Sequence, residues 1–415
     1  AVDPEAAGLR GPSTGTLPAH ADVVVVGGGY GGLEAAATLA QLGRSVVVVD
    51  RHDLGWGASS RNGGMSIPEL KAGPRTLIEK FGPLGARLHA EVEDAFDHVE
   101  SLVGPGGSIE CDYERSGQLY LTHGAKGVRA LEALAEEHES VGSPARVVTG
   151  EDLVAEAGSR LFAGGLVLER TGGLHPAKFH AGLVARARAE GAALFPHTPA
   201  HRIEPASGAG HVVRTPRGTV HAGQVLLATN AYADTLVPGL RRRVLPMDSF
   251  IIATEPLDPG VAATVLPTRR MTFNDRNLLW YWRHGPDGRL LFGGRKRLGE
   301  VTLPEARDFL HESMLTAHPQ LIGTKVDRVW GGRVALTLDR LPHCGQVDGL
   351  WYATGCNGSG VALNTWMGRR MAGALCGQEL PAFAELTHRS IPLHGQRKVW
   401  LPVVGSWFRL EDSRS

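Results

Sequence analysis

The chain has 415 residues, which is long enough for two domains or for one large domain with a substantial hydrophobic core. Its 43 lysines and arginines balance its 43 aspartates and glutamates, so the sequence offers no broad basic surface that would attract nucleic acid. The 4 cysteines are too few for a secreted disulfide scaffold and form no Cys-x-x-Cys pair, which favours reduced thiols and a cytoplasmic location.

The N-terminal segment, residues 1–20, is rich in glycine and proline and lacks the apolar stretch of a signal peptide. We expect it to form an extended arm that leads into the first strand. No apolar run in the sequence approaches the ~20 residues that a membrane-spanning helix needs, so we expect no membrane span.

The next segment has the pattern of a βαβ unit that binds a dinucleotide. Residues 21–26 predict a buried strand, and the six residues from Gly27 to Gly32 read Gly-x-Gly-x-x-Gly. Residues 33–42 then predict a helix, and a second valine-rich strand ends at Asp50. The glycines permit a tight turn and the approach of a pyrophosphate to backbone N–H groups, and the positive helix N-terminus favours phosphate. Asp50 stands where a carboxylate accepts hydrogen bonds from a ribose.

After a loop of glycine and small polar residues at 51–65, the sequence leaves this nucleotide unit and later returns to it. One buried helix face is predicted by Leu84, Leu88, Val92, Phe96, Val99 and Val103. The next predicted elements are a strand at 109–122, helices at 125–139 and 175–191, a strand at 193–203, a hairpin of 211–214 with 219–221, and a strand at 225–229.

Residues 244–292 are strand-rich, and an Asp-Gly turn at 287–288 predicts a hairpin between 278–282 and 290–292. A helix is predicted over 304–318. A last strand at 350–354 runs into the glycine cluster 355–360 and a helix that ends at Leu375. This alternation predicts two domains, each assembled from separated segments.

Six glycine-rich or small-residue motifs occupy residues 21–32, 57–64, 172–178, 227–232, 287–294 and 355–360. In sequence and order they resemble the D-amino acid oxidase superfamily of FAD-dependent amine oxidases, and within it the gamma-glutamylputrescine oxidase-like branch. The resemblance implies an α/β fold (α+β overall) in which a Rossmann-like FAD-binding domain is interleaved with a smaller, strand-rich substrate domain. The expected FAD-binding domain comprises residues 1–105, 150–240 and 326–380, the substrate domain 106–149 and 241–325, and residues 381–415 a tail packed on the FAD-binding domain.

The resemblance also implies FAD as the cofactor, wrapped by the loop that follows the acidic residue. Serine hydroxyls and backbone N–H groups satisfy pyrophosphate oxygens, and glycines let the main chain lie against a flat ring. Each segment has a plain structural alternative: an ordinary turn, a flexible loop or a helix cap. The expected FAD ligands are Gly27, Gly29, Tyr30, Gly31, Gly32, Asp50, Arg51, Ala58, Ser59, Ser60, Arg61, Asn62, Gly63, Gly64, Thr229, Asn230, Gly355, Asn357, Gly358, Ser359 and Gly360.

For the substrate, an aromatic wall of Trp280, Tyr281 and Trp282 would align the reacting carbon and disfavour a charged ammonium. Strand alternation sends Tyr281 to the opposite face from the two tryptophans, so at least one of the three is ordinary packing.

Three cations near the predicted hairpin are further candidates. Lys296 is a candidate for a cation near flavin N5 that stabilises developing superoxide, with surface solvation as its alternative. Arg283 and Arg295 either grip a substrate carboxylate or hold the hairpin together. His175 is expected to shape a helix start as a satisfied cap or core histidine, with catalysis as the alternative.

At several positions the residue type differs from the one that is usual in the resembling family. Sarcosine oxidases carry arginines in the neighbourhood of Met65 and Pro68, which argues against N-methylglycine as the substrate. Asn230 stands where a glycine is usual, and Cys356 and Ser359 replace a tyrosine and a histidine. Residues 331–339 contain no cysteine that would tether the flavin, so we expect non-covalent FAD.

The sequence thus favours an FAD-dependent oxidase of a primary or secondary amine or amino acid. A hydride would pass from the α-carbon to flavin N5, and O2 would reoxidise the flavin to give an imine or aldehyde and H2O2. The alternatives are a dehydrogenase that uses a quinone or protein acceptor, an NAD-dependent dehydrogenase, and a non-catalytic flavin-binding subunit or sensor.

Overall fold

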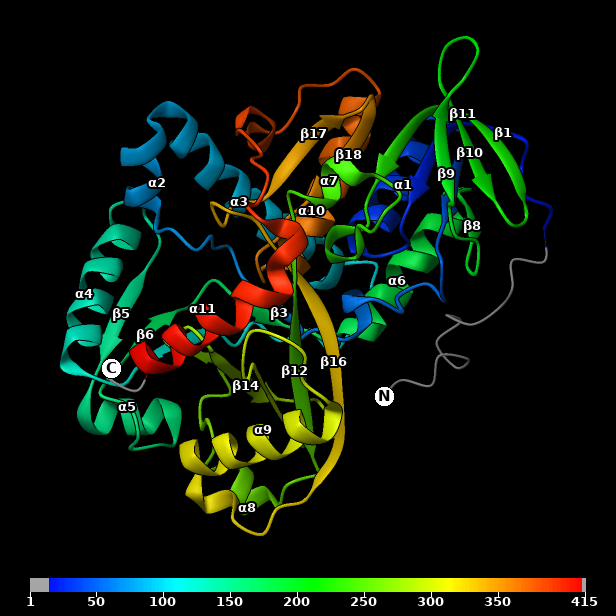
Figure 1. The fold of residues 1–415 in the computed structure, drawn as a ribbon. Helices are drawn as coiled ribbons and strands as arrows, with labels where there is room; N and C mark the ends of the chain where they lie inside the picture. Colours follow the sequence, from blue (N-terminus) through cyan, green and yellow to red (C-terminus); the bar gives the residue numbers. More distant parts are fainter. Residues whose placement is uncertain (1–14, 413–415) are drawn as a thin grey trace.

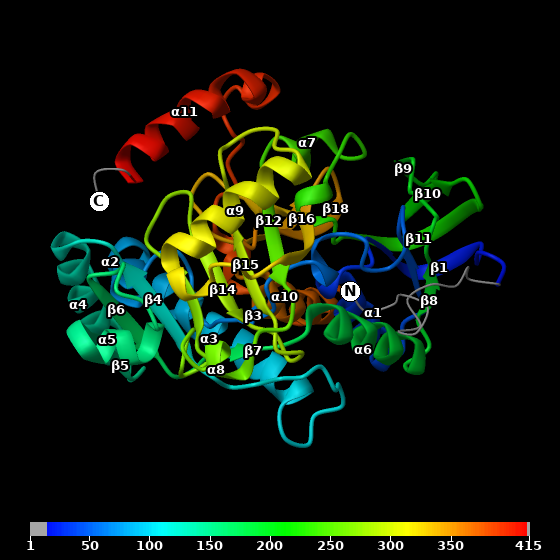
Figure 2. The same ribbon diagram turned by 90° about the horizontal axis from the view of Figure 1, so that it is seen from below.

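The computed structural model describes residues 15–412, and the chain forms two large β-sheets covered by helices (Figures 1 and 2). Of the expected N-terminal arm, residues 1–14 lie outside the described range, and residues 15–19 lead into the first strand. In the described part, no helix is both long and apolar enough to cross a membrane. All four cysteines are free thiols.

The first sheet is the doubly wound sheet that the βαβ pattern predicts. Its strands run in the order β17-β18-β11-β1-β2-β8, with β10 paired to β11 and β9 to β10. The central strands are parallel, with Val23 of β1 opposite Val46 of β2 and Val26 of β1 opposite Leu227 of β11. The strands are β1 (His20–Val26), β2 (Val46–Val49), β8 (Ala193–Phe195), β9 (Arg202–Pro205), β10 (His211–Thr215), β11 (Gly218–Leu227), β17 (His343–Val347) and β18 (Leu350–Thr354).

Four helices share one apolar core with the first sheet. They are α1 (Tyr30–Gln41), α3 (Pro83–Val103), α6 (Pro176–Ala189) and α10 (Gly360–Leu375). Helices α1 and α10 pack closely because glycines stand at the contact: a Cβ on Gly31 would lie 2.8 Å from the carbonyl oxygen of Asn364. This contact brings the N-termini of both helices to the same side of the sheet.

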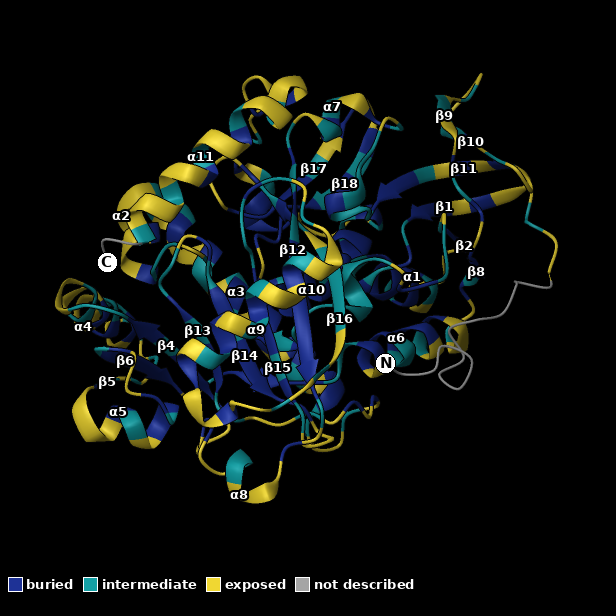
Figure 3. Cartoon of the chain, turned by 60° about the horizontal axis from the view of Figure 1, so that its bottom comes forward, coloured by how far each residue is buried: buried dark blue, intermediate teal, exposed yellow. Residues whose placement is uncertain are grey.

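The second sheet has the order β16-β12-β15-β14-β13-β4-β6-β5. Helix α9 (Leu303–Ala317) packs on one face, where the buried side chains of β12, β14 and β15 form a core (Figure 3). The strands are β4 (Gln118–Thr122), β5 (Ala145–Val148), β6 (Gly164–Leu168), β12 (Leu245–Thr254), β13 (Met271–Asn274), β14 (Trp280–His284), β15 (Leu290–Gly294) and β16 (Val326–Leu336).

Shorter elements complete the fold. Strands β3 (Met65–Ser66) and β7 (Gly172–Gly173) form a two-stranded sheet. The remaining helices are α2 (Pro74–Phe81), α4 (Ala125–Glu139), α5 (Gly150–Ala157), α7 (Pro238–Arg241), α8 (Pro259–Ala262) and α11 (Arg397–Asp412).

The structure differs from the expected domain bounds at two strands and one helix. Strand β6 lies in the second sheet, although residues 150–240 were expected in the FAD-binding domain, and β16 lies there too, although residues 326–380 were expected in the first. Helix α11 of the tail packs its Leu401 with Met247, Leu278 and Leu298 of the second-sheet side, not on the FAD-binding domain.

Local predictions also needed correction. Helix α1 begins at Tyr30, three residues before the predicted start, and only the last five residues of the predicted strand 109–122 are in β4. The predicted strand 193–203 is divided between β8 and β9, where His197 adopts a positive φ of 52°.

Candidate functional site

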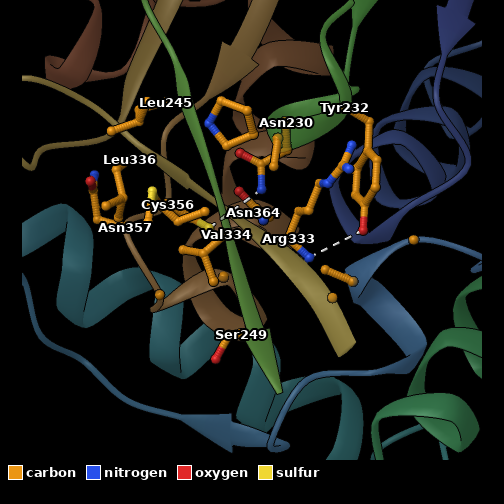
Figure 4. Close-up of a pocket in the computed structure, with 18 of the residues that line it drawn as sticks. Asn230, Tyr232, Leu245, Ser249, Arg333, Val334, Leu336, Cys356, Asn357 and Asn364 are labelled. Atoms are coloured by element: carbon orange, nitrogen blue, oxygen red, sulfur yellow. Dashed lines mark hydrogen bonds between the residues drawn. The ribbon is translucent and has the colours of Figure 1, made fainter. Parts of the chain in front are cut away.

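A cavity of about 960 Å³ lies between the carboxyl ends of the first sheet's parallel strands and the face of the second sheet opposite α9. Figure 4 shows Asn230 and Cys356 from the first side close to Val334 and Leu336 of β16. The volume is at the upper end of the range for small-molecule and cofactor sites, and the carboxyl ends of parallel strands are the expected place for such a ligand.

The glycine motif forms one end of this cavity. Gly27 has φ +111°, and a Cβ there would lie 2.8 Å from the carbonyl oxygen of Ala228, so a side chain is excluded twice. Gly29, Gly31 and the backbone of Tyr30 line the cavity at the start of α1. Gly32 does not line it, because its Cα packs against the Gly27 carbonyl, which is the helix-packing role of the third glycine. This cradle fits a pyrophosphate.

Asp50 follows β2 at the same end of the cavity. Its Oδ2 accepts a hydrogen bond from the Gly28 N–H at 2.7 Å and its Oδ1 one from the His52 N–H at 2.9 Å. Burial raises the pKa of Asp50, and these two backbone bonds counteract part of that rise. Each carboxylate oxygen keeps a second lone pair, so Asp50 can still accept a ribose hydroxyl. Next to it, Arg51 lines the cavity and pairs with Asp234.

The small-residue loop is locked onto α1. The Ser59 hydroxyl accepts a hydrogen bond from the Tyr30 N–H at 3.1 Å, and the Asn62 amide donates to the Tyr30 hydroxyl at 3.0 Å. The Tyr30 ring packs on Phe179, with the ring centroids 5.1 Å apart. Ala58, Ser59, Arg61, Asn62 and Gly63 line the cavity, whereas Ser60 and Gly64, also expected as FAD ligands, do not.

Ser60 and Gly64 instead fix the ends of the loop. The Ser60 hydroxyl donates to the Gly55 carbonyl, and the Gly64 N–H donates to Asn62 Oδ1 at 2.7 Å.

The ends of β11 and β18 meet at the cavity. Thr229 and Asn230 after β11 line the cavity. Asn230 has φ +44°, a left-handed conformation that asparagine tolerates best after glycine, which explains why it can stand where relatives have glycine. Its Oδ1 accepts from the Gly355 N–H at 3.1 Å, which joins the ends of β11 and β18.

The start of α10 forms the facing wall. Asn357, Gly358, Ser359 and Gly360 line the cavity, whereas Gly355 does not. The Asn357 Oδ1 accepts from the Thr337 N–H at 3.1 Å, so that side chain braces β16 rather than pointing at a ligand. Among the described residues no side chain caps α10, which leaves its first N–H groups available to an electron-rich ring edge.

Of the three aromatic residues predicted to form a substrate wall, one lines the cavity. Tyr281 lines the cavity, where its hydroxyl lies 3.1 Å from that of Ser249 and a Cβ on Gly63 would lie 3.2 Å from its ring. Trp280 and Trp282 were wrong as cavity walls. They point to the opposite face of β14 into the core under α9, where Trp282 stacks on Phe292 at 5.2 Å.

Arg283 and Lys296 follow the structural alternatives given for them rather than the substrate and flavin roles. Arg283 donates to the carbonyl oxygens of Gly63 at 2.6 Å, Leu174 at 2.7 Å and His284 at 3.0 Å, and burial lowers its pKa to about 10. It holds the loop and does not line the cavity, which favours the alternative of a structural role over contact with a substrate carboxylate. Lys296 is half-buried outside the cavity lining. His175 is the expected cap, since its Nδ1 accepts from the Lys178 N–H.

Arg295 lines the cavity beside Tyr281, and within the described chain its buried Nε has no hydrogen-bond partner. Burial lowers the pKa of Arg295, and the charge of Arg340 lowers it further. Lys71 and Arg340 line the same cavity. Sequence reasoning missed Lys71, Arg340 and Ser249, since no motif or periodicity marks them.

Comparisons with known proteins find similarity to FAD-dependent oxidoreductases. The family model "FAD dependent oxidoreductase" (DAO) matches residues 22–374. Over 94% of this chain and 92% of the relative, the chain is 32% identical to the gamma-glutamylputrescine oxidoreductase of Escherichia coli. It is also 32% identical to the probable oxidoreductase OrdL of Haemophilus influenzae, over 87% of this chain and 84% of that one.

Among solved structures, glycine oxidase from Geobacillus kaustophilus matches 90% of this chain and 100% of its own, with a TM-score of 0.73 and 22% identity, which supports the fold. The chain belongs to the DAO family of FAD-dependent oxidoreductases, and FAD is its cofactor.

Proposed function

We propose that this flavoenzyme is an oxidase of a primary or secondary amine or amino acid, with O2 as its electron acceptor. The observation that carries the proposal is the position of Arg295 and Tyr281 in the same cavity as the glycine cradle and the start of α10. When bound, FAD supplies the electron sink for removal of a hydride from the carbon next to nitrogen.

The chain's own groups bind and orient the substrate. Arg295, with its unpartnered buried Nε, is available to a substrate carboxylate, and Lys71 and Arg340 lie within electrostatic range of it. The Tyr281 ring and the apolar strand residues around it exclude water and disfavour an ammonium charge on the reacting nitrogen. The uncapped start of α10 favours negative charge developing nearby by up to about 2 kcal/mol.

We also propose that FAD is held without a covalent bond. The thiol among the cavity-lining residues is that of Cys356, which is buried and accepts a hydrogen bond from the Asn230 amide at 3.5 Å. Acid precipitation should therefore leave all the flavin in the supernatant. Flavin retained in the protein pellet would contradict this point.

Anaerobic titration of the FAD-loaded protein tests the main proposal. Amines, polyamine conjugates and D- and L-amino acids are added while the flavin absorbance is followed, and air is then admitted while H2O2 is measured. Bleaching by at least one compound, with rapid recovery and one H2O2 per turnover, is expected. Bleaching with slow recovery in air would favour the dehydrogenase, and bound FAD that no compound bleaches would favour a non-catalytic protein.

A further inference from the structure

A second, smaller cavity of about 110 Å³ adjoins the main one. It lies behind the segment 67–74 and is lined by residues of α2, α3, α4, β4 and β13. The smaller cavity is a side pocket of the main cavity, and this name is kept below. The lining residues that the two cavities share are Ile67, Lys71, Tyr120, Phe273 and Ser359.

Polar atoms without partners lie around the side pocket. Glu69 lines it, and the Glu69 Oε1 accepts a hydrogen bond from the Gln118 amide. Gln118 Oε1 and the Nδ1 of His138, which also lines the pocket, are buried and have no hydrogen-bond partner within the described chain. Because a buried polar atom without a partner is costly, and the pocket has room for several water molecules, these atoms favour water in the side pocket.

Glu69 changes its charge near neutral pH. Burial raises the pKa of Glu69 to about 7, and the charge of Lys71 and the hydrogen bond from Gln118 limit that rise. Near pH 7, therefore, the carboxylate and the carboxylic acid are both populated, and the carboxylate can accept a proton.

The other titratable groups on the walls of the side pocket are uncharged at pH 7. Burial lowers the pKa of His89 on α3, lowers that of His138 on α4 to about 4, and raises that of Tyr120 on β4 to about 12. Asp275, after β13, acts on Tyr120 from the side of the main cavity. Of these four wall residues, Glu69 is therefore the one that exchanges a proton near pH 7.

The proposed oxidation of an amine needs such a proton acceptor. A hydride leaves the carbon next to nitrogen when the nitrogen has a free lone pair, but an alkyl amine with a pKa of about 10 arrives as its ammonium. One N–H bond must therefore break first, with the electron pair left on nitrogen. Arg295 and Arg340 line the main cavity, but a guanidinium has no acceptor atom for this proton.

We propose that Glu69 accepts the proton that the substrate ammonium loses before oxidation, through water at the junction of the side pocket and the main cavity. This inference rests on the proposed function and names a proton acceptor for its first step. The ammonium becomes a neutral amine and the carboxylate becomes a carboxylic acid, so atoms and charge balance. The charge of Lys71 at the junction favours the carboxylate form that is ready to accept the proton.

The pH dependence of flavin reduction tests the inference. FAD-loaded enzyme is mixed with a saturating amine in the absence of oxygen between about pH 5 and 10, and stopped-flow absorbance gives the rate constant of flavin reduction. In wild type this rate constant should be level above about pH 7 and fall about tenfold per pH unit below it, because protonated Glu69 cannot accept a second proton.

The Glu69→Gln variant should behave differently. At pH 7 its rate constant should be about a hundredfold lower than that of wild type. It should then rise continuously toward the pKa of the free amine, about 10, because the ammonium loses its proton to solvent instead. Glu79→Gln, an exposed position on α2, is the matched control and should keep the wild-type profile.

A second readout needs no turnover. The infrared C=O band of a protonated carboxyl group should titrate near pH 7 in ligand-free wild type and in Glu79→Gln, and be absent from Glu69→Gln. Absence of this band from wild type would overturn the inference. So would an unchanged pH profile in Glu69→Gln, or a loss of rate by the same factor at every pH, which indicates a structural role. Failure of the proposed function looks different: the flavin then stays oxidised with every amine at every pH.

Discussion

Arg283 donates from Nε to the carbonyl oxygen of Gly63 at 2.6 Å, which fastens the small-residue loop to β14 of the second sheet. The same guanidinium reaches Leu174, so one buried cation joins the loop, the segment before α6 and the hairpin. The loop that lines the cofactor cavity is therefore held from the substrate side of the molecule.

Replacement of Arg283 by Met should loosen this loop. Three carbonyl oxygens lose their donor, and a cost of about 3 kcal/mol or more in the free energy of unfolding is expected. FAD affinity should fall with it. Thermal unfolding and FAD fluorescence measure both effects, and Arg269→Met, which breaks an exposed pair with Glu114, should cost less than about 1 kcal/mol. Normal stability with selective loss of carboxylate substrates would instead restore the role expected from the sequence.

Replacement of Gly27 by Ala should give protein with little bound flavin. The new Cβ meets the Ala228 backbone, and φ +111° is unfavourable for any other residue, with a strain of about 1–3 kcal/mol. Gly208→Ala is the control, because no atom lies within 4 Å of a Cβ there. The ratio of flavin to protein absorbance after purification measures the effect. Equal flavin content in the two variants would contradict the role of Gly27 in the cradle.

The adjacent cations Arg295 and Lys296 should behave differently. Arg295→Leu removes the cavity cation and should raise the dissociation constant of substrates that carry a carboxylate by about tenfold to a hundredfold. Lys296 lies outside the cavity lining, so Lys296→Met should leave the dissociation constant of these substrates nearly unchanged. Anaerobic titration of both variants with an amino acid and with the corresponding amine separates the effects. A larger loss in Lys296→Met than in Arg295→Leu would reverse the assignment.

The sequence predicted the first sheet and its glycine cradle because those signals are local: periodicity, glycines and a terminal acid within about thirty residues. It could also predict that Tyr281 and the two tryptophans face opposite sides, since alternation is a property of the strand itself. Which side faces the cavity depends on α9, which follows later in the chain and covers the tryptophan face.

Long-range partners explain the other errors. Strand β16 has a mixed burial pattern and owes its place in the second sheet to ten residue pairs with β12, so its sequence alone carries a weak strand signal. Glu69 and Lys71 lie in a segment without regular structure, and they line a small cavity only because β4 and β13 pack behind them.

The free energy of unfolding should depend on pH through the ionisation of Glu69. Its pKa is raised from 4.5 to about 7, so the folded state binds this proton more tightly than the unfolded state. The stability of wild type relative to Glu69→Gln should therefore fall as pH rises from about 4.5 to 7, by about 3 kcal/mol in total, and be constant above that range. Urea unfolding of ligand-free protein between pH 5 and 8 measures this difference.

The other titratable groups that face Glu69, namely Lys71, His89 and His138, are present in both proteins and cancel to first order. A stability difference that does not change with pH would mean that Glu69 ionises at its ordinary value.

Helix α11 lines one side of the main cavity with Trp400, Leu401, Val404 and Phe408. Trp407 on the same helix is 60% exposed and is not among the residues that line the cavity. Trp400→Ala should therefore speed the dissociation of FAD and raise KM, because it opens the cavity to water and removes packing against the cluster around Leu298.

Trp407→Ala removes the same side chain from the exposed face and should change neither quantity. The rate at which FAD transfers to an excess of an apoprotein that binds FAD tightly, together with KM for the best amine, distinguishes the two variants. Equal behaviour of Trp400→Ala and Trp407→Ala would mean that α11 does not cover the cavity in solution, since only Trp400 of the two lines the cavity.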